Sequence, residues 1–363
     1  MASSSGFDRE YVPMRLDPAT WQGRHVLLTG HTGFKGAWLA LWLERMGAKV
    51  TGLSLPPESS EGAFSRMGPW ATRSRIGDLR DAGFVRSVVT EANPSVVLHL
   101  AAEALVRRAY REPTATFETN VMGTINLLEA AREQRDLEAV LVVTSDKVYE
   151  NASMAPAREN DPLGHVDPYS SSKACVELAV RAWRSSYFEA RGVGLATVRA
   201  GNVIGGGDTA QDRLVPDVLR ADVAGSPVVL RNPESIRPWQ HVLDPLHGYL
   251  LFTQRLIDDT GEPHALNFGP DELNWTVGDV IEHLHRRLGG GRIEVSGEPG
   301  PKEAPALLLN SDLAKSTLGW RPLIGTQEAI EWTVRWHRAQ LSNGDVRDVA
   351  LEQVRTVEDR AAA

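Results

Sequence analysis

The sequence predicts an α/β protein built on a doubly wound parallel sheet, followed by a smaller mixed α/β C-terminal region. Apolar, β-branched runs alternate with amphipathic stretches over the first two hundred residues, as expected for strands buried on both faces of a parallel sheet. A glycine triad follows the first of these runs. After Gly205, glycine and proline become frequent and the apolar runs become short and isolated, which indicates a second, smaller region.

The predicted elements alternate strictly. The strands are the apolar runs 24–30, 48–55, 95–102, 139–146 and 193–203. The helices carry apolar side chains at three- and four-residue spacing and cover 36–47, 81–92, 119–133 and 168–187. Because strand–helix–strand crossovers are right-handed, these elements predict one sheet with helices on both faces.

Composition excludes several classes of function. The net charge of −8 argues against nucleic-acid binding, which needs clustered Lys and Arg, but leaves room for an anionic ligand in a small basic pocket. Cys175 is the one cysteine, so no intrachain disulfide can form. No apolar run approaches the ~20 residues of a membrane span, and the start lacks a secretory signal. We therefore expect a soluble, cytoplasmic protein without a metal, since no cluster has metal-ligand spacing.

The first predicted strand runs into "GHTGFKG" and then a helix. Gly30 permits a tight turn, Gly33 lets the backbone approach a pyrophosphate, and Gly36 lets helix and strand pack closely. The helix N-terminus adds free N–H groups and a positive dipole. This context predicts a dinucleotide site in a Rossmann-type fold. The same loop carries three further candidates for cofactor binding, Thr32, Phe34 and Lys35.

The Gly-x-x-Gly-x-x-Gly spacing resembles the extended branch of the short-chain dehydrogenase/reductase superfamily. This resemblance implies that "GDLRD" faces the adenine and that "LHLAAE" lines the cofactor. An acidic residue normally ends the second strand and holds the NAD ribose, but Ser54 stands there. No Arg is adjacent to hold an NADP 2′-phosphate, so we expect NAD, tightly associated and recycled within the catalytic cycle. The residues assigned by this resemblance are Asp78, Leu79, Leu100, Ala101 and Ala102.

"PYSSSKA" supplies Tyr169 and Lys173, which share one helix face at i, i+4 spacing. A cationic lysine favours the phenolate, so the tyrosine can take a proton from a sugar hydroxyl. In the superfamily, Ser145 would hold the same hydroxyl. Tyr169 and Lys173 are also expected to contact the cofactor.

Asp146 and Lys147 follow Ser145 at a predicted strand end. A 4,6-dehydratase must remove a proton from carbon 5 and protonate the leaving hydroxyl on carbon 6, whereas an epimerase needs neither step. We interpret the two side chains as a coupled acid and base sharing a proton. The competing interpretation, an exposed ion pair, is disfavoured because ligands of such folds bind at strand C-terminal ends.

Six segments resemble the CDP-D-glucose 4,6-dehydratases, over about residues 20–335: "GHTGFKGAWLALWL", "TNVMGTINLLEA", "TSDKVYEN", "ENDPLGHVDPYSSSKACVEL", "AGNVIGGGD" and "RPWQHVLDPLHGYL". The resemblance implies conversion of CDP-D-glucose to CDP-4-dehydro-6-deoxy-D-glucose by internal hydride transfer from carbon 4 to carbon 6, with loss of water. Lys147 would be the base at carbon 5 and Asp146 the acid at the carbon 6 hydroxyl. The chain departs from the pattern at Glu103-Ala104, where Gln-Pro is expected, and at Lys302, where His is usual.

In the same frame, Asn202 is a candidate diphosphate ligand, and Arg213 and Arg237 could neutralise the phosphates with fork geometry. Trp239 and His241 would shape the base or sugar end. Asn120 completes the predicted substrate site, whereas His99 is expected to be a packed strand residue. The partner is therefore a small-molecule nucleotide sugar.

The predicted organisation is a flexible tail at 1–20, an NAD-binding domain over 21–203 and roughly 236–264, and a nucleotide-sugar domain over 204–235 and 265–340. The end, 341–363, is expected to be a charged tail, either a solvated helix or frayed. Helices 119–133 and 168–187 are apolar enough to pair into a four-helix bundle, so we expect a homodimer or homotetramer.

Three alternatives remain open. A sugar-nucleotide 4-epimerase or reductase would keep Ser145, Tyr169 and Lys173 without needing the acid–base pair. A dehydratase of another nucleotide sugar, dTDP- or UDP-linked, would use the same chemistry, although the dTDP-glucose type shows Thr-Asp-Glu where this chain has Ser-Asp-Lys. A non-catalytic NAD-sensing protein would be expected to lack Tyr169 or Lys173.

Overall fold

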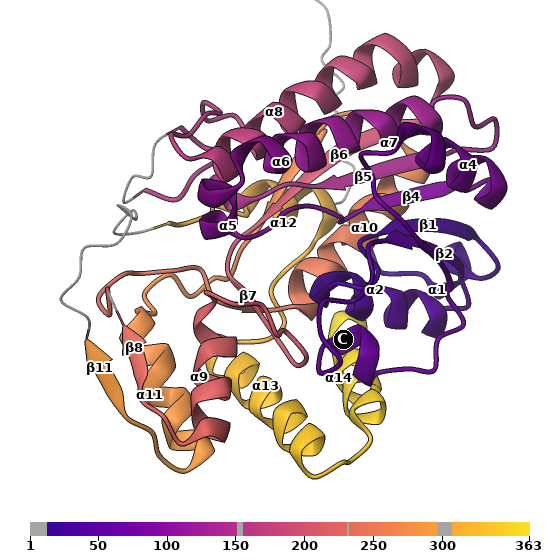
Figure 1. Ribbon diagram of the computed structural model, residues 1–363. Coiled ribbons are helices and arrows are strands. Elements are labelled where there is room, and N and C mark those ends of the chain that lie inside the picture. Colours follow the sequence, from indigo (N-terminus) through magenta and orange to yellow (C-terminus); the bar gives the residue numbers. More distant parts are fainter. Residues whose placement is uncertain (1–12, 151–154, 231, 296–306) are drawn as a thin grey trace, which may run out of the picture.

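The fold is centred on one parallel sheet. The computed structural model describes residues 13–150, 155–230, 232–295 and 307–363. The strands of the sheet are β1 (His25–Thr29), β2 (Lys49–Ser54), β3 (Arg73–Ile76), β4 (Val96–His99), β5 (Ala139–Val143), β6 (Gly194–Ala200) and β10 (Ala265–Phe268). Their order is β10-β6-β5-β4-β1-β2-β3, and every neighbouring pair is parallel (Figure 1). The order 3-2-1-4-5-6 is that of dinucleotide-binding sheets, so the predicted fold class is confirmed.

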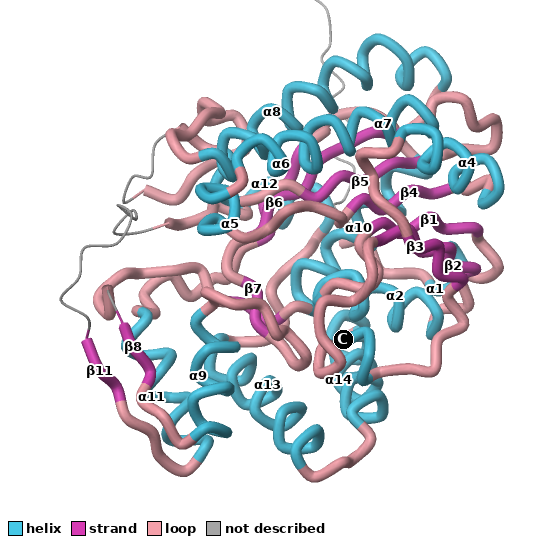
Figure 2. The backbone as a smooth tube through the Cα atoms, in the orientation of Figure 1, coloured by secondary structure: helices cyan, strands magenta, loops and turns pink. Residues whose placement is uncertain are grey.

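Helices cover both faces of the sheet because successive strand residues point to opposite sides. Leu27, Val97 and Val140 face one apolar cluster, whereas their chain neighbours face a second, tryptophan-rich cluster. The first cluster is completed by α4 (Ala82–Ala92), α7 (Gly123–Ala131) and α8 (Pro168–Trp183). The second is completed by α2 (Phe34–Arg45) and α10 (Leu243–Asp258). Figure 2 shows the two helical layers around the strands.

The helix predicted over 119–133 begins earlier in the structure. It starts as α6 (Pro113–Phe117), continues through the π-helical segment η1 (Glu118–Met122) and ends as α7. A π-helical insertion of this kind rotates the residues before it relative to those after it, and it often lies at a functional site. The other short elements are α1 (Pro18–Trp21), α3 (Ala63–Arg66), α5 (Val106–Arg111), α12 (Asp312–Leu318), η3 (Arg184–Phe188) and η4 (Glu189–Arg191).

The second region lies below the sheet in Figure 1. It contains α9 (Leu214–Ala224), α11 (Val277–Leu288) and α13 (Thr326–Leu341), with the strand pairs β7 (Val203–Ile204)–β9 (Gln240–His241) and β8 (Val228–Leu230)–β11 (Ile293–Val295). The predicted domain boundary after residue 264 is wrong at one place. Residues 265–268 form β10, which pairs with β6 in the main sheet.

The chain ends differ from the predicted tails. Residues 1–12 lie outside the described residues, but within the predicted tail the Met14 N–H donates to the Leu318 carbonyl (3.0 Å) and α1 begins at Pro18. The charged segment after 341 is not a solvated tail, because Val346–Ala362 form helix α14 with one buried apolar stripe. Glu358 of α14 accepts hydrogen bonds from the Trp42 indole (3.0 Å) and from Arg45 (2.9 Å) of α2. None of the described helices is long and apolar enough to cross a membrane.

Candidate active site

The glycine loop forms a tight backbone cradle between β1 and α2. Gly30 has φ +76°, and a Cβ there would lie 2.7 Å from the Ala101 nitrogen. A Cβ on Gly36 would lie 2.0 Å from the Gly30 carbonyl oxygen, so only glycine fits this first turn of α2. The positive φ and the close approach are what the predicted pyrophosphate cradle requires, and the loop therefore fits a dinucleotide.

The β4 loop is held beside this cradle by a buried hydroxyl. Thr29 Oγ1 accepts hydrogen bonds from the backbone N–H groups of Leu100 (3.2 Å) and Ala101 (3.1 Å) and donates to His99 Nδ1 (2.7 Å). The other ring nitrogen of His99 donates to Thr124 (2.9 Å), whose own hydrogen is given to a carbonyl. Burial lowers the pKa of His99 to about 3. His99 is a neutral, packed strand residue that shapes the loop, as expected.

The far end of the cradle carries hydroxyls where an acid is usual. Ser54 at the end of β2 hydrogen-bonds Thr32 Oγ1 (2.7 Å), and Thr32 donates to the Leu55 carbonyl (2.9 Å). Asp78, after β3, accepts from the Arg80 backbone and guanidinium, and these hydrogen bonds hold the pKa of Asp78 below its ordinary value. Leu79 is buried against Gly123. The glycine loop, Ser54 and Asp78 thus lie at the C-terminal ends of three neighbouring strands, β1, β2 and β3 respectively.

The acid–base candidates lie in a short 3₁₀ turn, η2 (Asp146–Val148), directly after β5. Ser145 Oγ donates to Asp146 Oδ1 (3.0 Å) and accepts from the Lys147 N–H (3.2 Å). Asp146 is 4% exposed, and its Oδ2 has no hydrogen-bond partner among the described residues. Burial raises the pKa of Asp146, against the opposing charges of Lys147, Lys35 and Arg237.

Tyr169 and Lys173 face this turn from the first turns of α8. Asp167 caps the helix by accepting from the Ser170 N–H (2.9 Å). Lys173 Nζ donates to the carbonyl of Val143, the last residue of β5 (3.0 Å). Burial raises the pKa of Tyr169 to about 12, and a hydrogen bond with Ser145 opposes the shift. Burial also lowers the pKa of Lys173 to about 8, so the lysine remains largely cationic at neutral pH.

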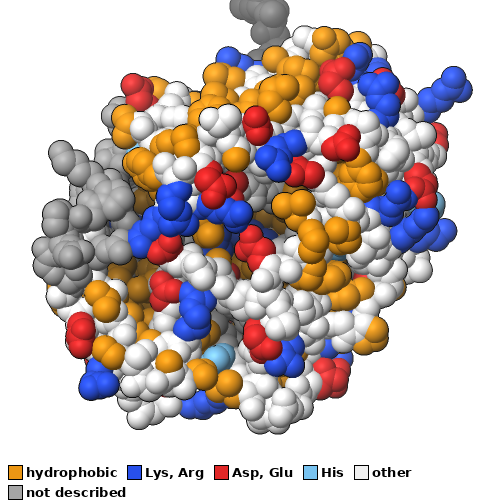
Figure 3. Space-filling view, in the orientation of Figure 1, with side chains coloured by type: hydrophobic (Ala, Val, Ile, Leu, Met, Phe, Trp, Pro, Cys, Tyr) orange, Lys and Arg blue, Asp and Glu red, His pale blue; other side chains and the backbone are white. Residues whose placement is uncertain are grey.

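Further cations lie near Asp146 and Tyr169. Lys35 and Arg237 lie close enough to Asp146 to lower its pKa, and the charge of Arg213 does the same to Tyr169. Burial lowers the pKa of Lys35 to about 8, and Arg213 adds to the effect. Arg213 forms an ion pair with Asp208 (3.1 Å). Figure 3 shows Lys and Arg side chains at mid-height of the face in view, with Asp and Glu side chains among them. The cations Lys35, Lys173 and Arg213 make the site itself locally basic, which suits an anionic ligand.

Comparison with known proteins places this geometry in a family. The family model of GDP-mannose 4,6 dehydratase matches residues 27–333. The chain belongs to this dehydratase family. A CDP-glucose 4,6-dehydratase of Salmonella typhimurium is 45% identical over 342 residues, covering 91% of this chain and 95% of the relative. A dTDP-glucose 4,6-dehydratase of Xanthomonas campestris pv. campestris is 29% identical, covering 88% and 93%.

A solved relative has the same fold. The crystal structure of a Thermus thermophilus UDP-glucose 4-epimerase in complex with NAD superposes with a TM-score of 0.76 at 27% identity, covering 86% of this chain and 98% of that one. The dehydratase family therefore shares its architecture with epimerases. The fold does not separate the two activities, so they must be distinguished by the side chains of the site.

Two of the predicted substrate residues, Asn120 and His241, are buried and contact other protein groups. Asn120 is buried in η1, where its amide bonds both backbone groups of Glu103 (2.8 and 3.1 Å) and the Ser172 hydroxyl (2.9 Å). His241 has no exposed surface and packs edge-on against Trp38 and Trp332.

The remaining substrate candidates differ in how far they are buried. Trp239 is 4% exposed within the tryptophan-rich cluster, so its ring is packed rather than open to a ligand. Asn202, after β6, is half-buried, and its carbonyl accepts from the Gln240 N–H (3.0 Å). Arg237 is 8% exposed and donates to the Ile236 carbonyl (2.8 Å).

Sequence reasoning missed a buried ion pair behind the site, Glu177–Arg199, with Nε and Oε1 2.8 Å apart. Two signals were available. Glu177 stands one helical turn after Lys173, and Arg199 is the one charged residue in strand β6. A charge in a strand buried on both faces must have a partner.

Proposed function

We propose that the protein is an NAD-dependent 4,6-dehydratase that converts CDP-D-glucose to CDP-4-dehydro-6-deoxy-D-glucose. The observation that carries the proposal is the carboxyl of Asp146, enclosed at a strand end with one oxygen unpartnered among the described residues, between Lys147 and the Tyr169–Lys173 pair. A 4-epimerase of this fold has no use for such an acid. The 45% identity to the Salmonella CDP-glucose 4,6-dehydratase supports the choice of nucleotide.

The cradle fits the proposed cofactor. The glycine loop 30–36 would hold the pyrophosphate, the hydroxyls of Thr32 and Ser54 would meet the ribose, and the 78–79 and 100–102 segments would line the adenine and nicotinamide ends. Bound NAD would supply a hydride acceptor at carbon 4 and the hydride donor at carbon 6. Arg213 and Arg237, with Asn202, are the proposed ligands of the substrate diphosphate, because guanidinium groups match phosphate oxygens.

The protein's own groups then move the protons. Ser145 holds the 4-hydroxyl while Tyr169 removes its proton, and the Lys173 charge stabilises the phenolate. The resulting 4-ketone acidifies carbon 5. Lys147, in its neutral form, takes the carbon 5 proton, Asp146 protonates the 6-hydroxyl, and water leaves with formation of the carbon 5–carbon 6 double bond. Lys147 finally returns its proton to carbon 5. The raised pKa of Asp146 suits it to hold the proton that it donates.

One assay tests this function. Purified protein is given NAD with CDP-, dTDP- or UDP-glucose, and the alkali-induced absorbance of the keto sugar is followed. CDP-glucose is expected to react with the highest kcat/KM. Failure to convert CDP-glucose would remove the nucleotide assignment, and a product that is only the 4-epimer would remove the dehydratase assignment altogether.

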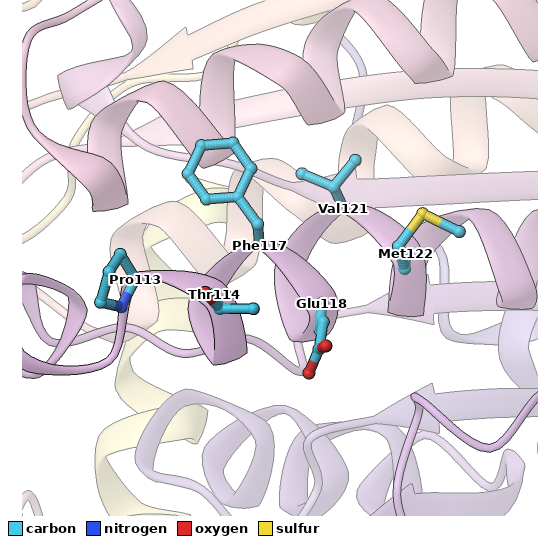
Figure 4. A pocket seen from close by; sticks show the side chains of 6 residues that line it. All are labelled: Pro113, Thr114, Phe117, Glu118, Val121 and Met122. Atoms are coloured by element: carbon cyan, nitrogen blue, oxygen red, sulfur yellow. The ribbon is translucent and has the colours of Figure 1, made fainter.

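We also propose that the protein is a homo-oligomer paired through α6–η1 and α8. Phe117, Met122 and Leu178 are 36%, 49% and 49% exposed on these adjoining helices. Figure 4 shows the open apolar groove along α6 and η1, with Phe117 and Val121 on one side of the helix and Glu118 on the other. A stable interface needs about 800 Å² per partner, which two such helices can supply.

The oligomer has its own test. Phe117→Glu with Leu178→Glu is expected to give monomers by sedimentation. The control is Val229→Glu on β8, where an equally apolar side chain is 60% exposed far from these helices. An unchanged mass in the double variant, or equal dissociation of the control, would refute this interface.

A further inference from the structure

A buried carboxylate lies directly behind the proposed proton-transfer groups. Glu177 is one turn beyond Lys173 on α8 and is 6% exposed. Its Oε1 accepts from Thr144 Oγ1 (2.5 Å) and Arg199 Nε (2.8 Å). Its Oε2 accepts from Thr197 Oγ1 (2.7 Å) and from the same guanidinium (2.9 Å). Burial disfavours the charged form, but the Arg199 and threonine hydrogen bonds hold the pKa of Glu177 below its ordinary value.

The third guanidinium nitrogen of Arg199, NH1, bonds groups other than Glu177. Arg199 is 2% exposed in β6, and NH1 donates to the Tyr149 hydroxyl (2.9 Å) and to the Glu159 carbonyl (3.1 Å). The guanidinium also lies over the Tyr149 ring, 5.1 Å from its centroid. Tyr149 donates onward to Asn267 Oδ1 (2.6 Å) on β10. Each of the three guanidinium nitrogens is therefore directed to a named acceptor.

Glu177 and Arg199 hydrogen-bond the residues on either side of the Ser145–Lys147 turn. Thr144, held by Glu177, immediately precedes Ser145. Tyr149, held by Arg199, comes two residues after Lys147. The turn that carries Ser145, Asp146 and Lys147 is thus held at both ends by one ion pair. Glu177 of that pair is on α8, the helix that also carries Tyr169 and Lys173.

Stability alone does not account for such a pair. Removing two charges from water costs several kcal/mol per ion, and buried pairs are often no better for stability than packed apolar side chains. Their documented advantage is in fixing one arrangement among several, because a bidentate fork tolerates little change of geometry. Here the arrangement fixed is that of the acid–base turn relative to the Tyr169–Lys173 face.

We infer that Glu177 and Arg199 are positioning residues, which set the distance between the Ser145–Lys147 turn and the Tyr169–Lys173 helix face. The inference rests on the proposed dehydratase function for its kinetic consequence, but the geometry that it describes does not depend on any substrate. Neither residue contacts the reacting atoms. Each acts through the group that it holds.

Two threonines offer a matched pair of variants. Thr144→Val removes the bond between Glu177 and the turn, whereas Thr197→Val removes an equivalent bond from the same carboxylate to β6 only. Both changes preserve shape and leave the Arg199 fork in place. Thr144→Val is expected to lower kcat for dehydration at least tenfold with KM nearly unchanged. Thr197→Val is expected to change kcat less than twofold at a similar urea midpoint.

A substrate-independent measurement separates this inference from the proposed function. Amide hydrogen exchange over residues 145–149 is expected to quicken in Thr144→Val and in Tyr149→Phe, which cut the two ends of the turn, and to be unchanged in Thr197→Val. If the wild-type protein converts no nucleotide sugar, the exchange result still decides the positioning role. Equal exchange and equal activity in Thr144→Val and Thr197→Val would overturn it.

Glu177→Gln adds a readout that a purely structural role would not move. The charged groups that face Lys173 are Glu177 on its own helix and Lys35 on α2, with neutral His99 on β4. Loss of the Glu177 charge is expected to shift the alkaline limb of the kcat/KM profile to lower pH. Thr144→Val retains the Glu177 charge, so the alkaline limb of its kcat/KM profile is expected at the same pH as in the wild-type protein. If Glu177→Gln does not fold because Arg199 is left unpaired, the comparison of Thr144→Val with Thr197→Val still tests the inference.

Discussion

At the scale of single residues, Asp146 and Lys147 have different surroundings although they are adjacent. Asp146 is enclosed, and burial raises the pKa of its carboxyl. Lys147 is half-buried beside it, and its charge is the largest of the influences that oppose that shift. In the proposed elimination Asp146 gives a proton to the leaving hydroxyl, and Lys147 must first lose its own proton before it can take the one on carbon 5.

Separate substitutions should therefore stop different steps. Asp146→Asn keeps the shape and is expected to lower dehydration by about 10²–10⁴-fold, because the proton for the leaving hydroxyl is lost. Solvent deuterium should still enter carbon 5 in this variant. Lys147→Ala should abolish that exchange as well. Mass spectrometry of recovered sugar nucleotide measures both outcomes, and normal exchange in Lys147→Ala would refute the base assignment.

At the scale of elements, the last helix, α14, covers one side of α2. The indole of Trp42 on α2 is fully buried, and its N–H is satisfied by Glu358 of α14. Arg347 of α14 further donates to the Met67 carbonyl (2.6 Å) and bonds Glu44 of α2 (3.3 Å). The helix that begins at the cofactor cradle is thus held from its outer side by the C-terminal segment.

Glu358→Ala is expected to lower the free energy of unfolding by about 1–3 kcal/mol, since it leaves a buried indole donor unpaired. Glu352→Ala on the same helix removes an ion pair with Arg335 whose two side chains are 50% and 51% exposed, and it should cost less than about 1 kcal/mol. Urea unfolding of the two variants provides the comparison. Equal losses of unfolding free energy in the two variants would show that the Trp42–Glu358 hydrogen bond contributes no more to stability than the exposed ion pair.

Particular elements show what the sequence could and could not predict. Strands such as β5, buried along their whole length, were predicted from apolar runs alone. The edge strand β3 was missed because "RSRI" is polar and largely exposed. The glycine loop and the Ser145–Lys147 turn were predicted because their chemistry is local. The core positions of Trp239 and His241 were not, since they depend on α2 and α13, which are distant in sequence.

At the scale of the whole molecule, buried histidines make the fold sensitive to acid. Burial lowers the pKa of His31 and His247 to about 4, and of His99 and His241 to about 3. The unfolded chain binds these protons below about pH 6.5, so each histidine removes about 1.4 kcal/mol of stability per pH unit as the pH falls from there toward the folded pKa. Asp244 acts oppositely: burial raises its pKa to about 7, and its contribution is lost as pH rises toward that value.

Seven of the described histidines have a lowered pKa, against four carboxyls whose pKa is raised (Asp146, Glu159, Asp217 and Asp244), so urea midpoints should fall between pH 6.5 and about pH 4. His247→Phe tests the cause. His247 stacks on Trp42 with both ring nitrogens unpaired among the described residues, so the apolar ring should fit. The variant should show a slope lower by about 1.4 kcal/mol per pH unit, which is one proton fewer. An unchanged slope would assign the acid sensitivity to other groups.

The docking of α14 on α2 also bears on how the protein is made. Trp42 and Glu358 are 316 positions apart, so a ribosome delivers the buried indole long before its partner. During synthesis the N-terminal half can build strands and the glycine loop, and α10 can cover part of α2, but the side of α2 that α14 covers stays open until Glu358 has been made. The side of α2 that α14 covers is therefore among the last parts of the cofactor-binding half to reach its native packing.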